Sequence, residues 1–177
     1  MKKILLAILL LWSIGSYAQI TSATLTASGL TCSMCSKSIY KALMNVPFVS
    51  TVDANVEKST FELKFKDGST VSFDELKKAV QDAGFSVASL KFVMSFSNQE
   101  ITPDSHINAA GNTFHFLHVS RQKLNGAKTL TLVDKNFLPA KEYKKYAKYT
   151  THKCFVTGMK EADCPANAAK RIYHVVL

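Results

Sequence analysis

Residues 29–39 read Gly29-Leu30-Thr31-Cys32-Ser33-Met34-Cys35-Ser36-Lys37-Ser38-Ile39 and place two thiols three positions apart. They lie where a pattern typical of a strand gives way to a pattern typical of a helix. A thiolate in the first turn of a helix is stabilised by unpaired backbone N–H groups. Its pKa falls, and it becomes a better ligand or nucleophile. The stretch therefore predicts soft-metal or thiol redox chemistry at this corner.

The residues on both sides of this corner predict the element order βαββαβ. Strands are expected at residues 20–28, 49–56, 60–66 and 85–92, and helices at 36–45 and 72–83. Pro47 stops the first helix, and Ser72 with Glu75 forms a capping box at the start of the second. Alternation continues to Phe96, so the last strand is expected to extend into the residues that follow.

With this order, residues 20–92 resemble the heavy-metal-associated domain. This is the ferredoxin-like module of copper chaperones, of the N-terminal repeats of metal-pumping ATPases and of periplasmic mercury-binding proteins. Gly29-Leu30-Thr31-Cys32-Ser33-Met34-Cys35 corresponds to the family pattern Gly-Met-Thr-Cys-x-x-Cys. Further matches are Ile39, Leu43, Val52-Asp53-Ala54-Asn55 and Leu76-Lys77-Lys78-Ala79-Val80-x-Asp82-Ala83-Gly84-Phe85. The strand and helix context makes the motif specific, and the resemblance implies Cys32 and Cys35 as metal ligands.

Two positions depart from the family pattern. Leu30 replaces the usual Met that packs beneath the metal loop, which is a change of similar volume. Phe85 stands where many bacterial members carry a Tyr and eukaryotic chaperones a Lys, so it offers neither a hydroxyl nor a charge near the metal.

The Cys32 and Cys35 pair suits a soft ion that needs few ligands. Two thiolates accommodate Cu(I) or Hg(II), whereas Zn(II) would need further ligands from a partner or water. We expect Cu(I), with Hg(II) or Zn(II) as alternatives, and exchange of the ion with a protein partner. The sequence shows no nucleophile motif, phosphate loop or acid–base pair, so an enzyme is not expected.

Residues 1–18 predict a secretory signal peptide. Met1-Lys2-Lys3 precedes an apolar run, and Ser16 and Ala18 suit cleavage after Ala18. The mature chain is then expected to be periplasmic or secreted, with no stable membrane insertion and with a formal charge lowered from +9 to +7 by the loss of two lysines. An oxidising compartment keeps two alternatives open: a thiol–disulfide redox partner of an exported metalloprotein, or a structural or interaction protein with both cysteine pairs oxidised.

The remaining residues predict a second, basic domain. Residues 93–177 hold twelve Lys and Arg against six Asp and Glu and all five histidines, whereas residues 19–92 hold eight against seven. Strands are expected at 113–119, 128–134, 154–157 and 171–176, a helix at 139–149, a loop at 97–112 and a turn at 125–126. We therefore predict an α+β chain: a signal peptide (1–18), a ferredoxin-like heavy-metal-associated domain (19–92), and a small mainly-β domain (93–177) with one helix and the strand order of an OB-like barrel.

The side chains of the second domain suggest mostly structural roles. The basic face of Lys141, Lys144, Lys145 and Lys148 is interpreted as solvated, with no nucleic-acid partner. His115 and His118 are three apart on a strand, so they point to opposite faces and cannot share an ion. His106, His152 and His174 could converge with Met94 or Met159, but each is interpreted as a hydrogen-bonded residue. Cys154 and Cys164 are expected to form a disulfide, with a second copper site as the alternative.

Overall fold

The computed structural model describes residues 18–30 and 33–177, so most of the predicted signal peptide, Thr31 and Cys32 lie outside the described residues. The strands are β1 (Ile20–Ser28), β2 (Val49–Asn55), β3 (Thr60–Phe65), β4 (Ser86–Ile101), β5 (Ser105–Ala109), β6 (Asn112–Phe116), β7 (Gln122–Leu132) and β8 (Ile172–Val176). The helices are α2 (Ser33–Met44), α3 (Phe73–Asp82), α4 (Ala140–Tyr146), the 3₁₀ helix η2 (Ala147–Tyr149) and α5 (Cys154–Thr157). None of these helices is long and apolar enough to cross a bilayer.

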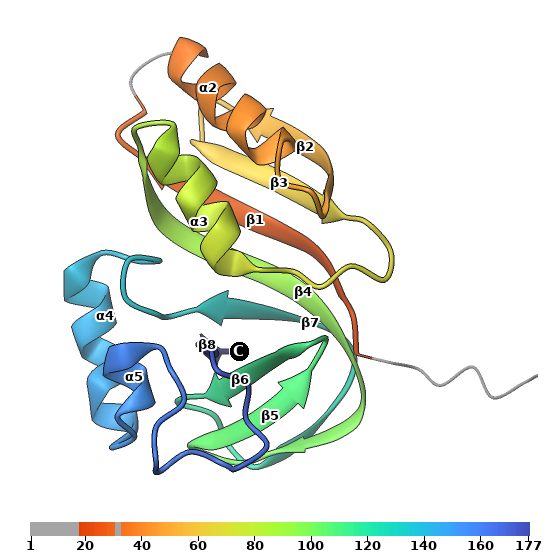
Figure 1. Cartoon of the computed structure of the whole chain (residues 1–177), viewed down its shortest axis with the longest axis vertical. Coiled ribbons are helices and arrows are strands. Elements are labelled where there is room, and N and C mark those ends of the chain that lie inside the picture. Colours follow the sequence, from red (N-terminus) through yellow and green to blue (C-terminus); the bar gives the residue numbers. More distant parts are fainter. Residues whose placement is uncertain (1–17, 31–32) are drawn as a thin grey trace, which may run out of the picture.

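The N-terminal half has the predicted βαββαβ order. Strands β2, β3, β1 and β4 are neighbours and pair antiparallel, and α2 and α3 cover one face of them (Figure 1). Both helices bury the expected stripes, with Ile39 and Leu43 from α2 and Phe73, Leu76 and Val80 from α3. The side chain of Ser72 accepts a hydrogen bond from the backbone N–H of Glu75 at 3.3 Å, which caps α3.

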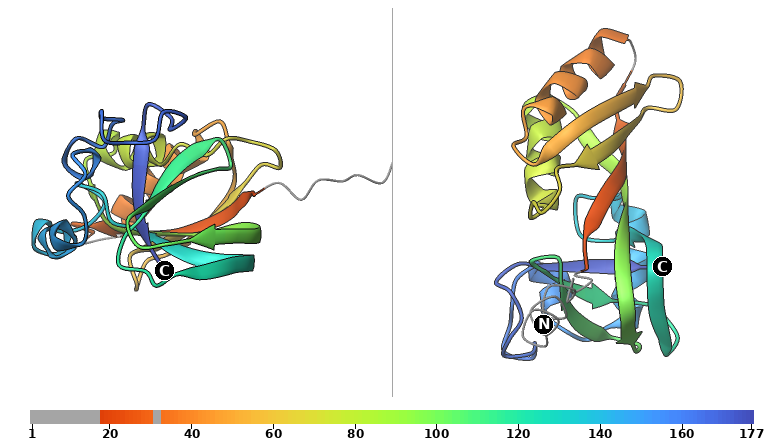
Figure 2. Two further views of the ribbon diagram at one scale, coloured as in Figure 1. Left: turned by 90° about the horizontal axis from the view of Figure 1, so that it is seen from below. Right: turned by 90° about the vertical axis from the view of Figure 1, so that its right-hand side faces the viewer.

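Strand β4 joins the two halves of the molecule. Its residues 86–94 pair with β1 and its residues 91–101 pair with β7, so it runs through the expected boundary after Phe92 (Figure 2). The aromatic core is shared as well, because the ring of Phe73 from α3 lies 4.6 Å from Phe92 and 5.0 Å from Tyr173 of β8. The two halves therefore form one continuous sheet and one main core.

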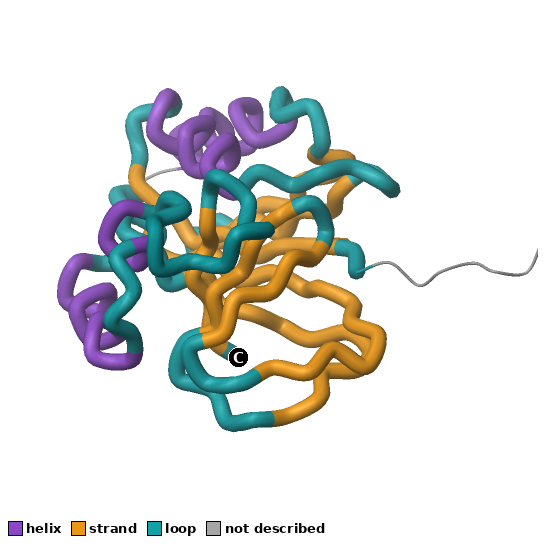
Figure 3. The backbone as a smooth tube through the Cα atoms, turned by 60° about the horizontal axis from the view of Figure 1, so that its bottom comes forward, coloured by secondary structure: helices purple, strands orange, loops and turns teal. Residues whose placement is uncertain are grey.

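The C-terminal half is mainly β, but its sheet differs from the expected barrel. The strand order β4-β7-β8-β6-β5 leaves β5 as an edge strand, so the sheet of the described residues is open and an OB-like barrel is not confirmed (Figure 3). Strand β8 pairs antiparallel with β7 and parallel with β6.

Three local predictions for this half are wrong. Residues 97–112 are not one loop, because β4 continues to Ile101 and β5 with β6 forms a hairpin whose two turn residues, Ala110 and Gly111, both have positive φ. Residues 125–126 lie within β7 rather than in a turn, with Gly126 opposite Phe96 at an irregularity in the pairing. Residues 154–157 form the short helix α5 rather than a strand, and four residues are too few to show a helical period.

A half-buried arginine links α3 to the C-terminal half. The Arg171 Nε donates to Asp74 Oδ2 of α3 at 2.6 Å, and its Nη1 donates to Asp134 Oδ1 at 3.1 Å. Burial raises the pKa of Asp74, but the hydrogen bonds from Arg171 and Lys77 lower it by more, so the pKa lies below its usual 3.8. One guanidinium thus neutralises carboxylates from both halves.

Changing Arg171→Met should lower the free energy of unfolding by about 1–3 kcal/mol, because the half-buried Asp74 and the buried Asp134 each lose a charged donor. Urea unfolding at pH 7 measures the loss. Since the pKa of Asp74 is lowered, its contribution is complete above pH 3.8 and is lost as the pH falls through the lowered value, so the difference between variant and native protein should shrink there.

The matched control is Arg121→Met, which removes an exposed pair with Glu100 and should cost about 0.5 kcal/mol or less. Equal losses in the two variants would contradict a bridging role for Arg171.

Candidate functional site

The predicted metal loop leads into α2. Cys35 is the third residue of this helix and is half-buried, and no acidic side chain occurs in the first helical turn. The positive end of a helix stabilises a thiolate placed in its first turn, so this position suits a thiolate ligand. Cys32, the other predicted ligand, lies outside the described residues. Met34, between the two cysteines in sequence, is 77% exposed.

Gly29, Leu30 and Phe85 support the start of this loop. Gly29 has a φ of +85°, and a Cβ added to it would lie 3.9 Å from Cδ1 of Phe85. Leu30 and Phe85 are both partly buried and pack against the main core. The phenyl ring is thus an apolar support beside the loop, where it supplies contact area but no hydroxyl or charge.

A second cluster of ligand-type side chains lies on the sheet of the C-terminal half. His106 of β5 is the partner of His115 on β6, and His115 is the partner of His174 on β8. The three histidines therefore form a row across three neighbouring strands. The rings of His106 and His115 stack with their centroids 3.9 Å apart, and those of His115 and His174 lie 5.1 Å apart.

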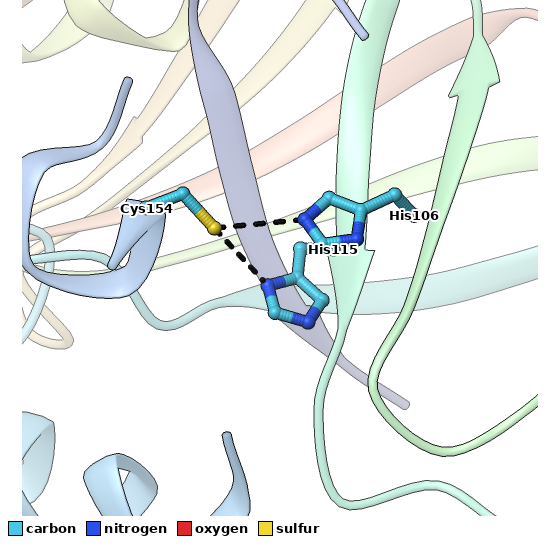
Figure 4. A group of neighbouring side chains, drawn as sticks. All are labelled: His106, His115 and Cys154. Atoms are coloured by element: carbon cyan, nitrogen blue, oxygen red, sulfur yellow. Dashed lines mark hydrogen bonds between the residues drawn. The ribbon is translucent and has the colours of Figure 1, made fainter. Parts of the chain in front are cut away.

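Cys154 of α5 lies over this row of histidines. Its Sγ is 3.5 Å from Nε2 of His106, 3.6 Å from Nδ1 of His115 (both in Figure 4) and 3.4 Å from Nε2 of His174. The thiol is fully buried, and burial raises its pKa. Phe155 holds α5 in place, because its ring stacks on Tyr143 of α4 at 4.7 Å.

The expected disulfide between Cys154 and Cys164 is wrong, because neither sulfur is in a disulfide. Cys154 is directed at the imidazoles instead, whereas the Sγ of Cys164 accepts from the backbone N–H of Glu161 at 3.5 Å. Cys164 belongs to a group with His106 and His152, whose ligand atoms all lie within 4.8 Å of one another.

Two carboxylates accept hydrogen bonds from His115 and His174, in each case from the ring nitrogen that does not face Cys154. His115 Nε2 donates to Asp104 Oδ1 at 2.7 Å, and His174 Nδ1 donates to Asp134 Oδ1 at 3.0 Å. Burial, together with the charges of neighbouring histidines, lowers the pKa of His115 to about 3 and that of His106 to about 4. These imidazoles are therefore neutral at pH 7, the form that binds metals.

His152 lies at the more exposed side of the cluster. Its ring is 5.0 Å from that of His106 and 5.3 Å from that of His115. Its Nδ1 is buried without a hydrogen-bond partner among the described residues, 3.4 Å from Asp163 Oδ2. His152 and Cys164 are both partly exposed, and their ligand atoms lie within 4.8 Å of that of His106, which contacts the buried sulfur of Cys154.

Sequence reasoning found part of this cluster. It suggested that His106, His152 and His174 could converge, and the structure brings them together, although with Cys154 and His115 rather than with Met94 or Met159. Its separation of His115 from His118 agrees with the structure, where the ring of His118 lies 4.1 Å from that of Tyr149, outside the cluster.

Sequence reasoning missed the pairing of His106 with His115. The two-residue turn at Ala110 and Gly111 makes these histidines partners, and Gly111 was the local signal for a turn there. The four lysines of the expected basic face on and after α4, Lys141, Lys144, Lys145 and Lys148, are exposed as expected.

Comparison with known proteins relates the N-terminal half to the heavy-metal-associated domain. The family model of the heavy-metal-associated domain matches residues 24–86, and no family match covers the C-terminal part. A mercuric transport protein periplasmic component from Pseudomonas fluorescens is 37% identical over 86 residues, which are 48% of this chain and 93% of the relative. The copper chaperone CopZ of Staphylococcus aureus is 30% identical over 63 residues, which are 36% of this chain and 91% of the relative.

Two solved structures also match part of this chain. Oxidised MerP from Ralstonia metallidurans CH34 is 38% identical, with a TM-score of 0.34, and the match covers 40% of this chain and 96% of that one. A CopZ metallochaperone matches 38% of this chain and 100% of its own length, with 26% identity and a TM-score of 0.36.

Changing Gly29→Ala should destabilise the start of the loop by about 1–2 kcal/mol, because the left-handed backbone conformation is costly for a residue with a Cβ. Thermal unfolding of the reduced protein measures the cost. Gly29→Asn is the control, since Asn adopts this conformation more readily and should cost less. The added Cβ meets Phe85 only at an ordinary contact distance, so a larger cost for Asn than for Ala would contradict the backbone explanation.

Proposed function

Because the chain belongs, through residues 24–86, to the heavy-metal-associated domain family, we propose that it is an exported carrier that binds Cu(I) through Cys32 and Cys35. The observation that carries the proposal is the position of Cys35 in the first turn of α2, at the end of the motif Thr31-Cys32-Ser33-Met34-Cys35. The relatives named for copper and for mercury support a soft ion as cargo, with Hg(II) as the alternative.

The proposed chemistry is ligand exchange on a cargo ion. Two thiolates leave coordination positions of the ion open, so a thiolate of the partner can form its bond to Cu(I) before a bond from Cys32 or Cys35 breaks. In this proposal the helix terminus stabilises the Cys35 thiolate that binds the ion, and Phe85 adds no ligand or charge that would hold the ion. The chain acts in this proposal as a carrier rather than as an enzyme.

Export forms part of the proposal. The expected signal peptide and the periplasmic relative from Pseudomonas fluorescens both support a location outside the cytoplasm. In an oxidising compartment the pair binds metal only while it is reduced, so a reducing partner or prior loading with metal is required.

Replacing both Cys32 and Cys35 by Ser should weaken Cu(I) binding on the order of 100-fold or more, since loss of a contact behind a ligand already costs about 10–100-fold. The measurement is competition between the reduced mature chain and a chromophoric Cu(I) chelator, repeated with Hg(II). Cys164→Ser is the control and should leave tight Cu(I) binding unchanged.

Equal Cu(I) affinity of the native chain and the double variant would contradict the proposal. So would a native pair that stays oxidised in a buffer poised at the potential of its compartment, because that behaviour indicates a structural bridge.

The exposed face of α2 is the proposed docking surface for the partner. Met34, Lys37, Lys41 and Met44 follow one another at intervals of three and four residues, and all four are exposed. Two cations flanked by two flexible apolar side chains favour a partner with an acidic rim and an apolar centre.

Changing Lys37→Glu with Lys41→Glu should slow Cu(I) transfer to an acidic acceptor about tenfold at low salt, because it reverses the charge that steers the encounter. The acceptor is a synthetic peptide with a C-x-x-C motif flanked by Asp and Glu, and transfer is followed by stopped flow. The control is Lys141→Glu with Lys144→Glu on α4. Equal slowing by the two pairs, or slowing that persists at high salt, would contradict a docking role for α2.

A further inference from the structure

The cluster around Cys154 has more hydrogen-bond acceptors than its protons can satisfy. A carboxylate only accepts hydrogen bonds, so Asp104 requires the proton of His115 on Nε2, and Asp134 requires the proton of His174 on Nδ1. The lone pairs of His115 Nδ1 and His174 Nε2 therefore both point to the sulfur of Cys154.

A thiol carries one proton and can donate to one of these two nitrogens. The other nitrogen is then left without a donor in a fully buried position, which costs about 1–3 kcal/mol. A cation that accepts both lone pairs and a thiolate would satisfy all three groups together.

The three sulfur-to-nitrogen distances match those between ligands around a tetrahedral ion. With bonds of about 2.3 Å to sulfur and 2.0–2.1 Å to nitrogen, two ligand atoms at a tetrahedral angle lie about 3.5 Å apart. The three distances from the Cys154 sulfur to His106, His115 and His174 are 3.5, 3.6 and 3.4 Å. The ligand atoms of His106, His115 and Cys154 also all lie within 4.8 Å of one another.

The side chains of the cluster are held in place by the elements around them. The histidines are on three hydrogen-bonded strands, and Cys154 is on a helix held by the packing of Phe155 on Tyr143. The carboxylates of Asp104 and Asp134 orient two of the imidazoles from behind, as carboxylates do behind metal-bound histidines. His152 and Cys164 give a partly exposed route of ligand atoms toward the buried sulfur.

We propose that Cys154, His106, His115 and His174 form a second metal site, which takes Zn(II). One thiolate with three imidazoles is a harder donor set than the two thiolates of the N-terminal motif, and its sulfur-to-nitrogen distances suit Zn(II). On binding, the Cys154 thiol gives its proton to solvent and its sulfur bonds the ion. This site shares no ligand with Cys32 and Cys35, so it stands or falls independently of the carrier function.

The test uses the full mature chain with Cys32 and Cys35 both changed to Ser, so that the N-terminal motif cannot bind. Zn(II) is titrated against a chromophoric chelator, and Co(II) serves as a spectroscopic probe of the same site. We expect one tight equivalent of Zn(II) per chain, a raised unfolding temperature with Zn(II), and a Co(II) spectrum with tetrahedral and thiolate-to-cobalt bands.

Three further substitutions, each added to the chain that carries Cys32→Ser and Cys35→Ser, test which residues bind the ion. Cys154→Ser should remove the thiolate-to-cobalt band. Asp104→Asn keeps every ligand and suits the φ of +59° at this position, so it should fold and still bind Zn(II) about 10–100-fold more weakly. His118→Asn, which removes the histidine outside the cluster, should change nothing.

The absence of tight Zn(II) binding in the chain that carries Cys32→Ser and Cys35→Ser would overturn the proposal, as would an octahedral Co(II) spectrum or undiminished affinity in both Cys154→Ser and Asp104→Asn. Tighter binding of Cu(I) than of Zn(II) at this cluster, judged by competition, would overturn the assignment of zinc. Cu(I) binding by the native chain without Zn(II) binding in the double variant would leave the carrier function standing and reject this site alone.

Discussion

The pairing of β4 with β1 on one part of its length and with β7 on the other is the constraint on which the rest of the structure depends. Because one strand belongs to both halves, the helices of the N-terminal half and the histidine row of the C-terminal half are attached to the same sheet. The rings of Phe73, Phe92 and Tyr173 pack against one another between α3 and β8. The heavy-metal-associated unit is therefore part of a larger core here.

The N-terminal half could be predicted from sequence because its signals are local. The stripes of α2 and α3, the Ser72 cap and the alternation in β3 each involve residues a few positions apart, and the structure has all of them. The position of Cys35 at a helix start followed from the same signals. Cys32 lies outside the described residues, so its role stays a prediction.

The C-terminal half could be predicted only in part because its organisation depends on distant pairing. Polar residues before β6 resemble a loop, yet they belong to two turns with the short strand β5 between them. The cysteines near the chain end resembled a disulfide pair because their partners from β5, β6 and β8 are far away in sequence. A row of histidines across three strands becomes visible only when the register is known.

The two faces of strand β8 contact different parts of the molecule. Tyr173 contacts Asp74 of α3 through its hydroxyl, and the next residue, His174, turns the opposite way to Cys154 and Asp134. Arg171, just before the strand, also reaches α3. Whatever restrains His174 therefore also restrains the strand that closes the N-terminal core. The two halves should consequently unfold as one cooperative unit. A ligand that restrains His174 on one face of β8 should then also reduce the mobility of the N-terminal core on the other face.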